Sequence, residues 1–132
     1  MKVRRLGLTM LMLLGLVSAH DSQSAGSVQV TLFTDADDLL RIQAPTRISF
    51  SFLHLGRPLT ACRCRVLLYR GTPSARVPPL KDLYLGPLQQ GEGNTVLDGL
   101  PEGGYTLVLD GRPIQFGDFD AFRMRYVLRA GP

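Results

Sequence analysis

The chain has 132 residues, the size of one domain, with 15 Lys and Arg against 11 Asp and Glu. Three of the basic residues and none of the acidic residues lie in positions 1–19, so the rest of the chain, with 12 basic and 11 acidic residues, has a net charge of +1. This near balance excludes the large basic surplus of a nucleic-acid-binding domain, and we expect no nucleic-acid partner.

Residues 1–19 have the three-part layout of a secretory signal peptide. The basic start MKVRR is followed by an apolar run of about a dozen residues and by the small-residue motif VSA, which suits cleavage after Ala19. The apolar run is shorter than the roughly 20 residues that a membrane span needs, and no second run follows, so we expect no transmembrane segment. The mature protein is therefore predicted to be secreted or periplasmic. A second cleavage position lies after Ala25.

The first part of the mature chain is predicted to be a short lead-in followed by two strands. Residues 20–27 are expected to form a flexible lead-in, with residues 28–130 as one folded domain. Apolar and polar side chains alternate along SVQVTLF (27–33) and RISFSFLHL (47–55), which is typical of half-buried strands. The face of the second segment that we expect to point inward carries Ile48, Phe50, Phe52 and His54.

Both cysteines lie in the next predicted strand, ACRCRVLLYRG (61–71). Alternation places Cys62 and Cys64 on its inward face and Arg63 and Arg65 on its outward face. The chain therefore presents its two thiols side by side toward the predicted interior.

The segments after this strand are predicted to be a loop, an edge strand and a strand pair. Three prolines exclude residues 71–80 from a central strand, and KDLYLGPL (81–88) is predicted to be a short edge strand. NTVLDGL (94–100) and GYTLVLD (104–110) are the next two predicted strands. After them, the dipeptide Asp110-Gly111 favours a hairpin turn.

About seven short strands with turn residues between them predict a single immunoglobulin-like antiparallel β-sandwich. LDGLPEGGYTLVLDG (97–111) resembles the L-P-x-G-x-Y-x-L segment of bacterial exported immunoglobulin-like and carboxypeptidase-regulatory-like domains, in which the tyrosine, here Tyr105, forms a tyrosine corner. LHLGRPLTACRCRVLLY (53–69) is similar to a passage of the same domains and of exported YtkA-like and FixH-like modules. The resemblance implies an extracytoplasmic sandwich and leaves the function open.

The spacing of Cys62 and Cys64 leaves three interpretations open. Side chains at i and i+2 of a regular strand lie about 6.6 Å apart, at about 3.3 Å per residue, whereas the Cβ atoms of a disulfide lie about 3.5–4.5 Å apart. A disulfide would therefore need a bend, such as a bulge next to the turn GRPLTA. Alternatively, the two cysteines fill the core as buried thiols. The third interpretation is a metal site.

The metal that suits this cysteine pair is copper(I), which prefers cysteine and methionine sulfur. If the two strands lie in opposite sheets, His54 and Cys62 meet at one end of the interior, and the last strand supplies Met124 as a further inward-facing ligand. We therefore consider a copper(I) site of Cys62, Cys64, His54 and Met124, and no other cofactor. Signal cleavage would also expose His20 as an N-terminal chelator, similar to the histidine brace of copper-binding β-sandwich proteins.

The outward faces of the cysteine strand and of the last predicted strand, AFRMRYVLRA (121–130), carry a stripe of arginines. The stripe consists of Arg63, Arg65, Arg123 and Arg125. Immunoglobulin-like folds place these two strands in one sheet, with a single strand between them. Such a stripe is predicted to bind a protein or an anionic component of the cell envelope. The alternative is a solvated face that nearby aspartates balance.

The sequence does not favour an enzyme. A Ser-His-Asp arrangement would have only His54 available, and no glycine-rich phosphate loop is present. The leading hypothesis is an exported, non-enzymatic binding or accessory module that acts through its loops or its arginine stripe. The alternative is a periplasmic copper-handling module built on Cys62 and Cys64 with His54. The sequence leaves the oligomeric state open.

Overall fold

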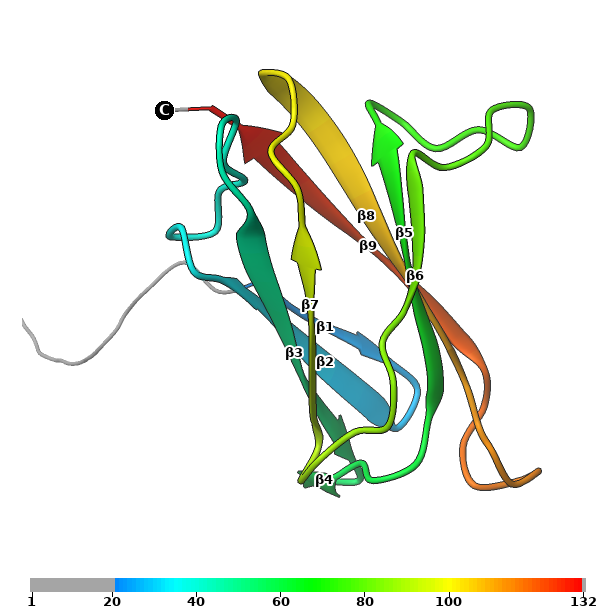
Figure 1. Cartoon of the computed structure of the whole chain (residues 1–132). Helices are drawn as coiled ribbons and strands as arrows, with labels where there is room; N and C mark the ends of the chain where they lie inside the picture. Colours follow the sequence, from blue (N-terminus) through cyan, green and yellow to red (C-terminus); the bar gives the residue numbers. More distant parts are fainter. Residues whose placement is uncertain (1–20, 132) are drawn as a thin grey trace, which may run out of the picture.

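The structure is a computed structural model that describes residues 21–131 (Figure 1). The predicted signal peptide (1–19) and His20 lie outside the described residues. Within these residues, no helix has the length and apolar character needed to cross a membrane.

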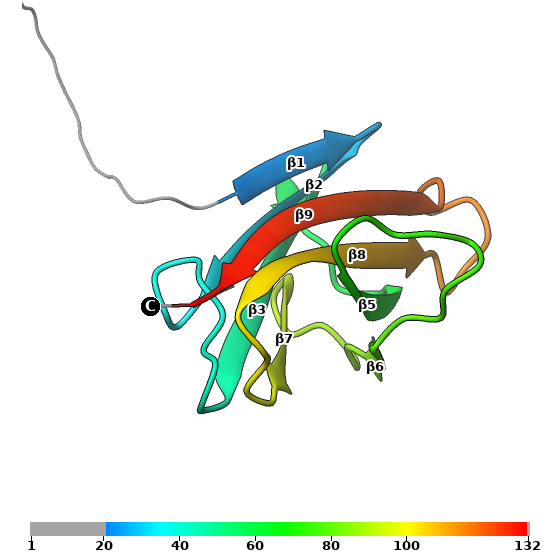
Figure 2. The same ribbon diagram turned by 90° about the horizontal axis from the view of Figure 1, so that it is seen from above.

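Two antiparallel sheets pack face to face (Figures 1 and 2). One sheet has the order β1-β2-β3-β7, with the short β4 paired to the end of β3, and the other has the order β6-β5-β8-β9. This arrangement confirms the predicted antiparallel β-sandwich. The strands are β1 Asp21–Ala25, β2 Val28–Thr34, β3 Thr46–His54, β4 Arg57–Pro58, β5 Arg63–Arg70, β6 Lys81–Tyr84, β7 Glu92–Leu97, β8 Gly103–Arg112 and β9 Phe122–Ala130.

The core lies between the two sheets, and alternation along the strands builds it. Phe50 and Phe52 of β3 are at most 1% exposed, and so is Tyr126 of β9. The rings of Phe50 and Tyr126 meet edge-on across the sandwich, with their centroids 6.2 Å apart. The Tyr126 hydroxyl donates a hydrogen bond of 3.1 Å to the carbonyl of Val30 in the opposite sheet. Burial raises the pKa of Tyr126 above its ordinary range, and this side chain therefore joins the sheets as a neutral donor.

Tyr105 of β8 makes the hydrogen bond expected of a tyrosine corner. Its hydroxyl donates to the carbonyl oxygen of Pro101 at 2.6 Å. The guanidinium of Arg70 lies over the ring, 5.5 Å from its centroid, and donates to the carbonyl oxygen of Glu102 at 2.9 Å. These contacts fix the chain where it crosses from β7 in one sheet to β8 in the other.

Residues 21–25 form a strand rather than the flexible lead-in that the sequence predicted. β1 pairs with β2 over its whole length, from Asp21 opposite Leu32 to Ala25 opposite Val28, around a turn at Gly26 with φ +60°. The Gln23 side chain donates to the backbone carbonyl of Arg125 in β9, so β1 also touches the opposite sheet. The sequence DSQSA has no apolar alternation, and its strand conformation depends on these partners.

The loop of residues 35–45 covers the free edge of β9. The Leu40 N–H donates to the carbonyl of Arg129 at 2.9 Å, and the Gly131 N–H donates to the carbonyl of Leu40 at 3.2 Å. Asp35 organises this loop: its carboxylate accepts hydrogen bonds from the Arg41 side chain at 2.7 Å and from the Arg47 N–H at 3.0 Å. These hydrogen bonds, led by that of Arg41, hold the pKa of Asp35 below its ordinary value.

The hairpin turn predicted at Asp110-Gly111 is wrong. β8 continues through both residues to Arg112, and the connection to β9 is a longer loop, residues 113–121. Gly111 faces the interior, opposite Phe122 of β9 and Cys64 of β5. A Cβ atom at this position would overlap the ring of Phe122. The glycine therefore serves close packing and not a turn.

Candidate functional site

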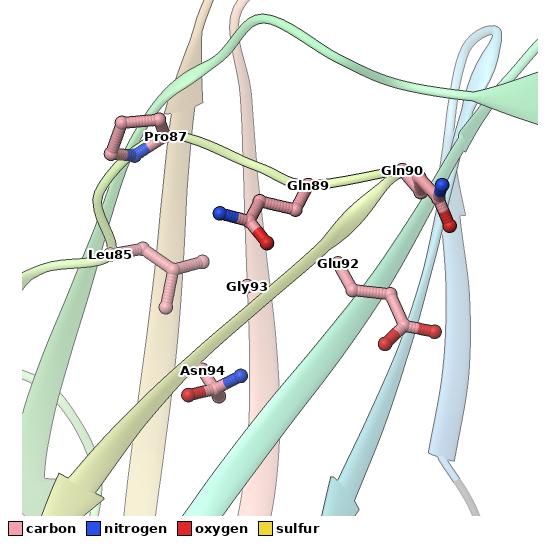
Figure 3. A pocket seen from close by; sticks show the side chains of 7 residues that line it. All are labelled: Leu85, Pro87, Gln89, Gln90, Glu92, Gly93 and Asn94. Carbon is pink, nitrogen blue, oxygen red and sulfur yellow. The ribbon is translucent and has the colours of Figure 1, made fainter.

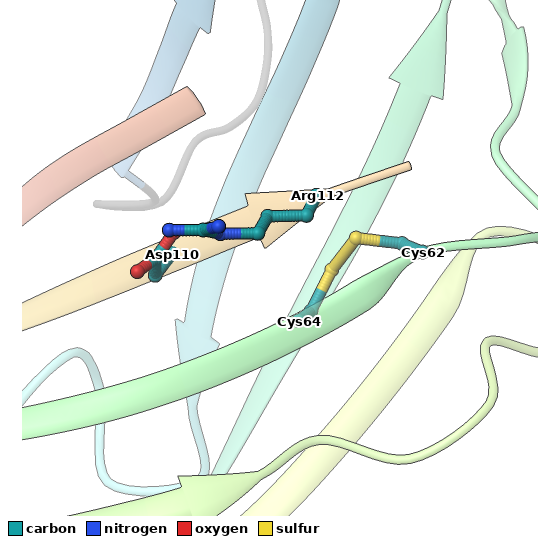
Figure 4. The surroundings of a disulfide bond; sticks show 4 residues. All are labelled: Cys62, Cys64, Asp110 and Arg112. Carbon is teal, nitrogen blue, oxygen red and sulfur yellow. A yellow bond between two sulfur atoms is a disulfide. The ribbon is translucent and has the colours of Figure 1, made fainter. Parts of the chain in front are cut away.

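Cys62 and Cys64 form a disulfide (Figure 4). Their Cα atoms are 5.5 Å apart, closer than the roughly 6.6 Å that two residues span in a regular strand. β5 begins only at Arg63, so Cys62 lies outside the strand, in the irregular segment after the turn that joins β3 to β4. The bend that a disulfide requires is present there. Both cysteines are also buried, at 1% and 0% exposure, as the core interpretation expected.

An aromatic group covers the interior beside the disulfide. The rings of Phe119 and Phe122 have centroids 5.9 Å apart, and the His54 ring lies 6.0 Å from that of Phe119. Because Phe122 occupies the space over Gly111, and Gly111 pairs with Cys64, these rings lie at the same end of the core as the disulfide. The position of His54 at this end agrees with the sequence-based expectation.

The oxidised pair has no thiolate, which is the form of cysteine that binds metals. Met124 of β9 lies opposite Leu109 of β8, which is one inward-facing position away from Gly111, the partner of Cys64. The sulfur of Met124 lies 3.6 Å from the Tyr126 hydroxyl oxygen. Among residues 21–131, no three His, Cys, Asp or Glu side chains form a group that could hold a metal ion. Copper(I) binding by Cys62, Cys64, His54 and Met124 stays a prediction, and it concerns the reduced chain.

The predicted arginine stripe lies on the outer side of the β6-β5-β8-β9 sheet, with β8 between β5 and β9 as expected. The register places Asp110 of β8 between Arg65 and Arg123, and Val108 between Leu67 and Arg125. Two further arginines that the sequence analysis did not include share this side. We call the whole set the arginine face: Arg63, Arg65, Arg112, Arg123, Arg125 and Arg129.

Acidic side chains neutralise only part of the arginine face. Arg65 forms a two-contact ion pair with Asp82 of β6, and this hydrogen-bonded pair raises the pKa of Arg65. Arg112 lies 4.0 Å from the carboxylate of Asp110, and Arg129 lies 3.8 Å from that of Glu102.

The other arginines of the face are not balanced in this way. Arg63, Arg123 and Arg125 are exposed, and their side chains make no ion pair with any residue of the described chain. Arg123 and Arg125 also follow each other on one side of β9, so two unpaired positive charges lie close together there.

The proline-rich loop of residues 71–80 lies against the outer side of this sheet (Figures 1 and 2). The Thr106 hydroxyl donates to the Gly71 carbonyl at 2.6 Å, and the Leu80 N–H donates to the Leu68 carbonyl at 2.7 Å, which anchors both ends of the loop. Val108 points outward from β8, yet it is only 2% exposed. Between the loop and the sheet lies an open pocket of about 250 Å³, the loop pocket, lined by Tyr69, Pro73, Ser74, Ala75, Val108, Arg123 and Arg125.

A larger and more polar hollow of about 660 Å³ lies beside β7 (Figure 3). Gly93 forms part of its wall, and a Cβ there would come within 2.9 Å of both Leu85 and Leu88. The sequence analysis selected none of the residues that line it: Leu85, Pro87, Gln89, Gln90, Glu92, Gly93 and Asn94. They carry no positive charge and no thiol.

No protein-family model and no curated protein matches the sequence. Among solved structures, the fold is similar to the crystal structure of the PmoD soluble domain from Methylocystis sp. ATCC 49242 (Rockwell), with a TM-score of 0.51 and 12% sequence identity. The match covers 83% of this chain and 96% of the PmoD domain. At this identity the likeness shows a common fold and no more. The family resemblance in the two sequence segments stays a prediction.

Proposed function

We propose that the protein is an exported, non-enzymatic binding module that docks on an anionic component of the cell envelope through its arginine face. The observation that carries the proposal is the pair of exposed arginines in β9, Arg123 and Arg125, that have no acidic partner in the described chain. Grouped guanidinium groups attract anionic surfaces at long range.

The distribution of acidic residues supports this proposal. Asp82, Asp110 and Glu102 each form an ion pair with one other arginine of the face, and none of them forms an ion pair with Arg123 or Arg125. The positive charge that remains is therefore concentrated on β9 and at the start of β5. Interactions of this kind weaken with salt, because the screening length falls from about 10 Å at 0.1 M ionic strength to about 3 Å at 1 M.

Vesicle sedimentation tests the proposal. The mature protein should bind vesicles that contain phosphatidylglycerol, and not vesicles of phosphatidylcholine alone, with an affinity that falls as salt is raised. Loss of both positive charges in R123E/R125E should weaken binding at least about thirtyfold, because each arginine near an anionic surface contributes about 1 kcal/mol.

The matched control is R47E/R57E, which makes the same change of charge at two exposed arginines of the opposite sheet, on β3 and β4. This control should bind within about threefold of the unmodified protein, because its altered charges lie outside the arginine face and act on the vesicle only at long range. Equal binding of both double variants, or no binding by the unmodified protein, would contradict the proposal.

Copper(I) binding is a second candidate function, which the disulfide geometry favours for the reduced chain. Cys62 and Cys64 are close enough in the fold to be bridged, so reduction would leave two sulfur ligands side by side. His54, which lies at the same end of the core as the two cysteines, is the additional ligand that we expect. Native mass spectrometry after anaerobic reduction should then show one bound copper ion, absent in C62S/C64S; an unchanged mass would remove this candidate.

A further inference from the structure

We infer that the loop pocket binds a phosphate ester group, with the two arginines of β9 holding its oxygens. The inference rests on the proposed function of the arginine face and assigns the ligand chemistry of one place within it. Its evidence is a pocket that combines two unpaired cations, an apolar floor and an anchored roof.

The two arginines supply the charge that a phosphate requires. Arg123 and Arg125 both line the pocket, and neither pairs with an acid among residues 21–131. Asp110 lies opposite Arg123 in the register, but its ion pair is formed with Arg112. A guanidinium donates two parallel hydrogen bonds to a phosphate, so two guanidinium groups suit a group with a charge near −2.

The other walls suit the organic part of an ester. Val108 and Tyr69 form an apolar surface under the loop, and Val127, the next outward residue after Arg125 on β9, is 79% exposed. A fully hydrated ion such as inorganic phosphate would leave these surfaces unused. The pocket volume of about 250 Å³ also exceeds what a lone carboxylate fills.

The pocket is formed before a ligand arrives. Pro73 restricts the loop beside Ser74, and the Ser74 hydroxyl already accepts a 3.2 Å hydrogen bond from the Arg76 N–H, which leaves its proton free for a ligand oxygen. On the other side, Gln23 of β1 holds the backbone of Arg125. A preformed site loses less conformational freedom on binding, which favours affinity.

The phosphate ester can belong to a lipid headgroup or to a soluble molecule, and the experiment separates the two. Glycerol 3-phosphate serves as the soluble probe, with acetate as the anion control and phosphatidylglycerol vesicles as the lipid probe. In ¹⁵N NMR spectra of the mature protein, glycerol 3-phosphate should cause saturable shifts at the amides of Arg123, Arg125, Ser74 and Ala75, and acetate should not. Absence of these shifts, or equal shifts with acetate, would overturn the inference.

The variant A75W fills the pocket without changing its charge. Ala75 is exposed on the loop, so a large side chain there does not enter the core, and thermal unfolding checks that the fold is kept. A75W should weaken glycerol 3-phosphate binding at least about tenfold, whereas V77W, at an exposed residue of the same loop that does not line the pocket, should not. A parallel loss of vesicle binding would identify the lipid headgroup as the source, and a loss for the soluble probe alone would identify a soluble ester.

The outcomes also separate this inference from the proposed function. If A75W binds both probes as the unmodified protein does while R123E/R125E fails to bind vesicles, the pocket is refuted and the arginine face stands. If R123E/R125E binds vesicles normally, the proposed function fails, and if it also binds glycerol 3-phosphate normally, the pocket fails as well.

Discussion

The two strands that flank β8 carry outward arginines but are held in different ways. A disulfide joins Cys64 in β5 to Cys62 just before the strand, and Arg65 of β5 is neutralised by Asp82. At the outer edge of β9, the Leu40 N–H and the Gln23 side chain donate hydrogen bonds to its backbone carbonyls. The two central arginines of β9 have no acidic partner in the described chain. We therefore expect the β5 side to contribute mainly to the stability of the fold, and the unpaired arginines of the β9 side to bind a ligand.

The largest expected effect on stability comes from Gly111, which joins the two sides. In G111A the new methyl group would overlap the Phe122 ring, and relief of this overpacking is expected to cost about 3 kcal/mol of the free energy of unfolding. Urea unfolding measures it. The control is G104A on the same strand, where an added Cβ meets nothing within 4 Å. Equal stability of the two variants would mean that the close contact over Gly111 is not rigid.

The next effect concerns β1, which supports the β9 side. A chain that begins at Gly26 loses the pairing with β2 and the hydrogen bond from Gln23 to Arg125, and we expect a loss of about 2 kcal/mol from several backbone hydrogen bonds. Urea unfolding against a chain that begins at Asp21 tests this. It also bears on signal cleavage, because cleavage after Ala25 would remove β1. If the predicted signal peptide is removed, we therefore expect the intact mass of the mature chain to correspond to a start at His20.

Reduction of the disulfide tests the β5 side. A bridge that closes only three residues constrains the unfolded chain weakly, so the reduced protein should be less stable by about 1.5 kcal/mol. Urea unfolding with and without reductant measures the difference. The variant C62A/C64A should show no further response to reductant. A loss much larger than this would mean that the bridge holds the segment before β5 in place, rather than merely restricting the unfolded state.

Removing the partner of Arg65 should make the β5 side resemble the β9 side. D82A frees Arg65, so binding to phosphatidylglycerol vesicles should become about fivefold tighter, as expected for about 1 kcal/mol per arginine. The free energy of unfolding should change by less than about 1 kcal/mol, because the pair is exposed. The control D98A removes an exposed acid whose lysine contact, at 3.9 Å, lies outside the arginine face. Equal binding of D82A and the unmodified protein would contradict the comparison.

The sequence predicted the fold well where alternation is strong. The segments 47–55, 61–71, 104–110 and 121–130 all contain strands close to the expected positions, and the arginines of β5 and β9 share one sheet face as predicted. The segments 47–55, 61–71 and 121–130 each bury one side, so their own residues determine which face points inward. The alternation of apolar and polar residues was sufficient to predict these strands, because the burial of one face is what produces the alternation. β8 differs, because Thr106 and Val108 on its outer side are buried as well.

The features that the sequence did not predict depend on contacts distant along the chain. β1 forms because its backbone pairs with the edge of β2 and its Gln23 side chain binds a backbone carbonyl of β9. The sequence DSQSA indicates neither contact. The disulfide depends on where β5 begins. The need for glycine at position 111 depends on the Phe122 ring, 11 positions later in the chain. The loop pocket exists because residues 71–80 lie on β8, which proline content alone does not indicate.

The smallest expected effect is the contribution of Asp35, which orders the loop along the free edge of β9. Hydrogen bonds from Arg41 and Arg47 lower the pKa of Asp35 in the folded state, so its contribution to stability is complete above the ordinary pKa of 3.8 and is lost as the pH falls through the folded-state value. D35N should therefore be slightly less stable than the unmodified protein at pH 7 and equal to it near pH 2. Thermal unfolding across this range measures the difference. The control is D37N in the same loop, which makes the same change of side chain and keeps the hydrogen bonds of Arg41 and Arg47 with Asp35. A difference for D35N that stays constant down to pH 2 would show that Asp35 acts through the shape of its hydrogen bonds and not through its charge, and the edge of β9 would then be held by backbone contacts alone.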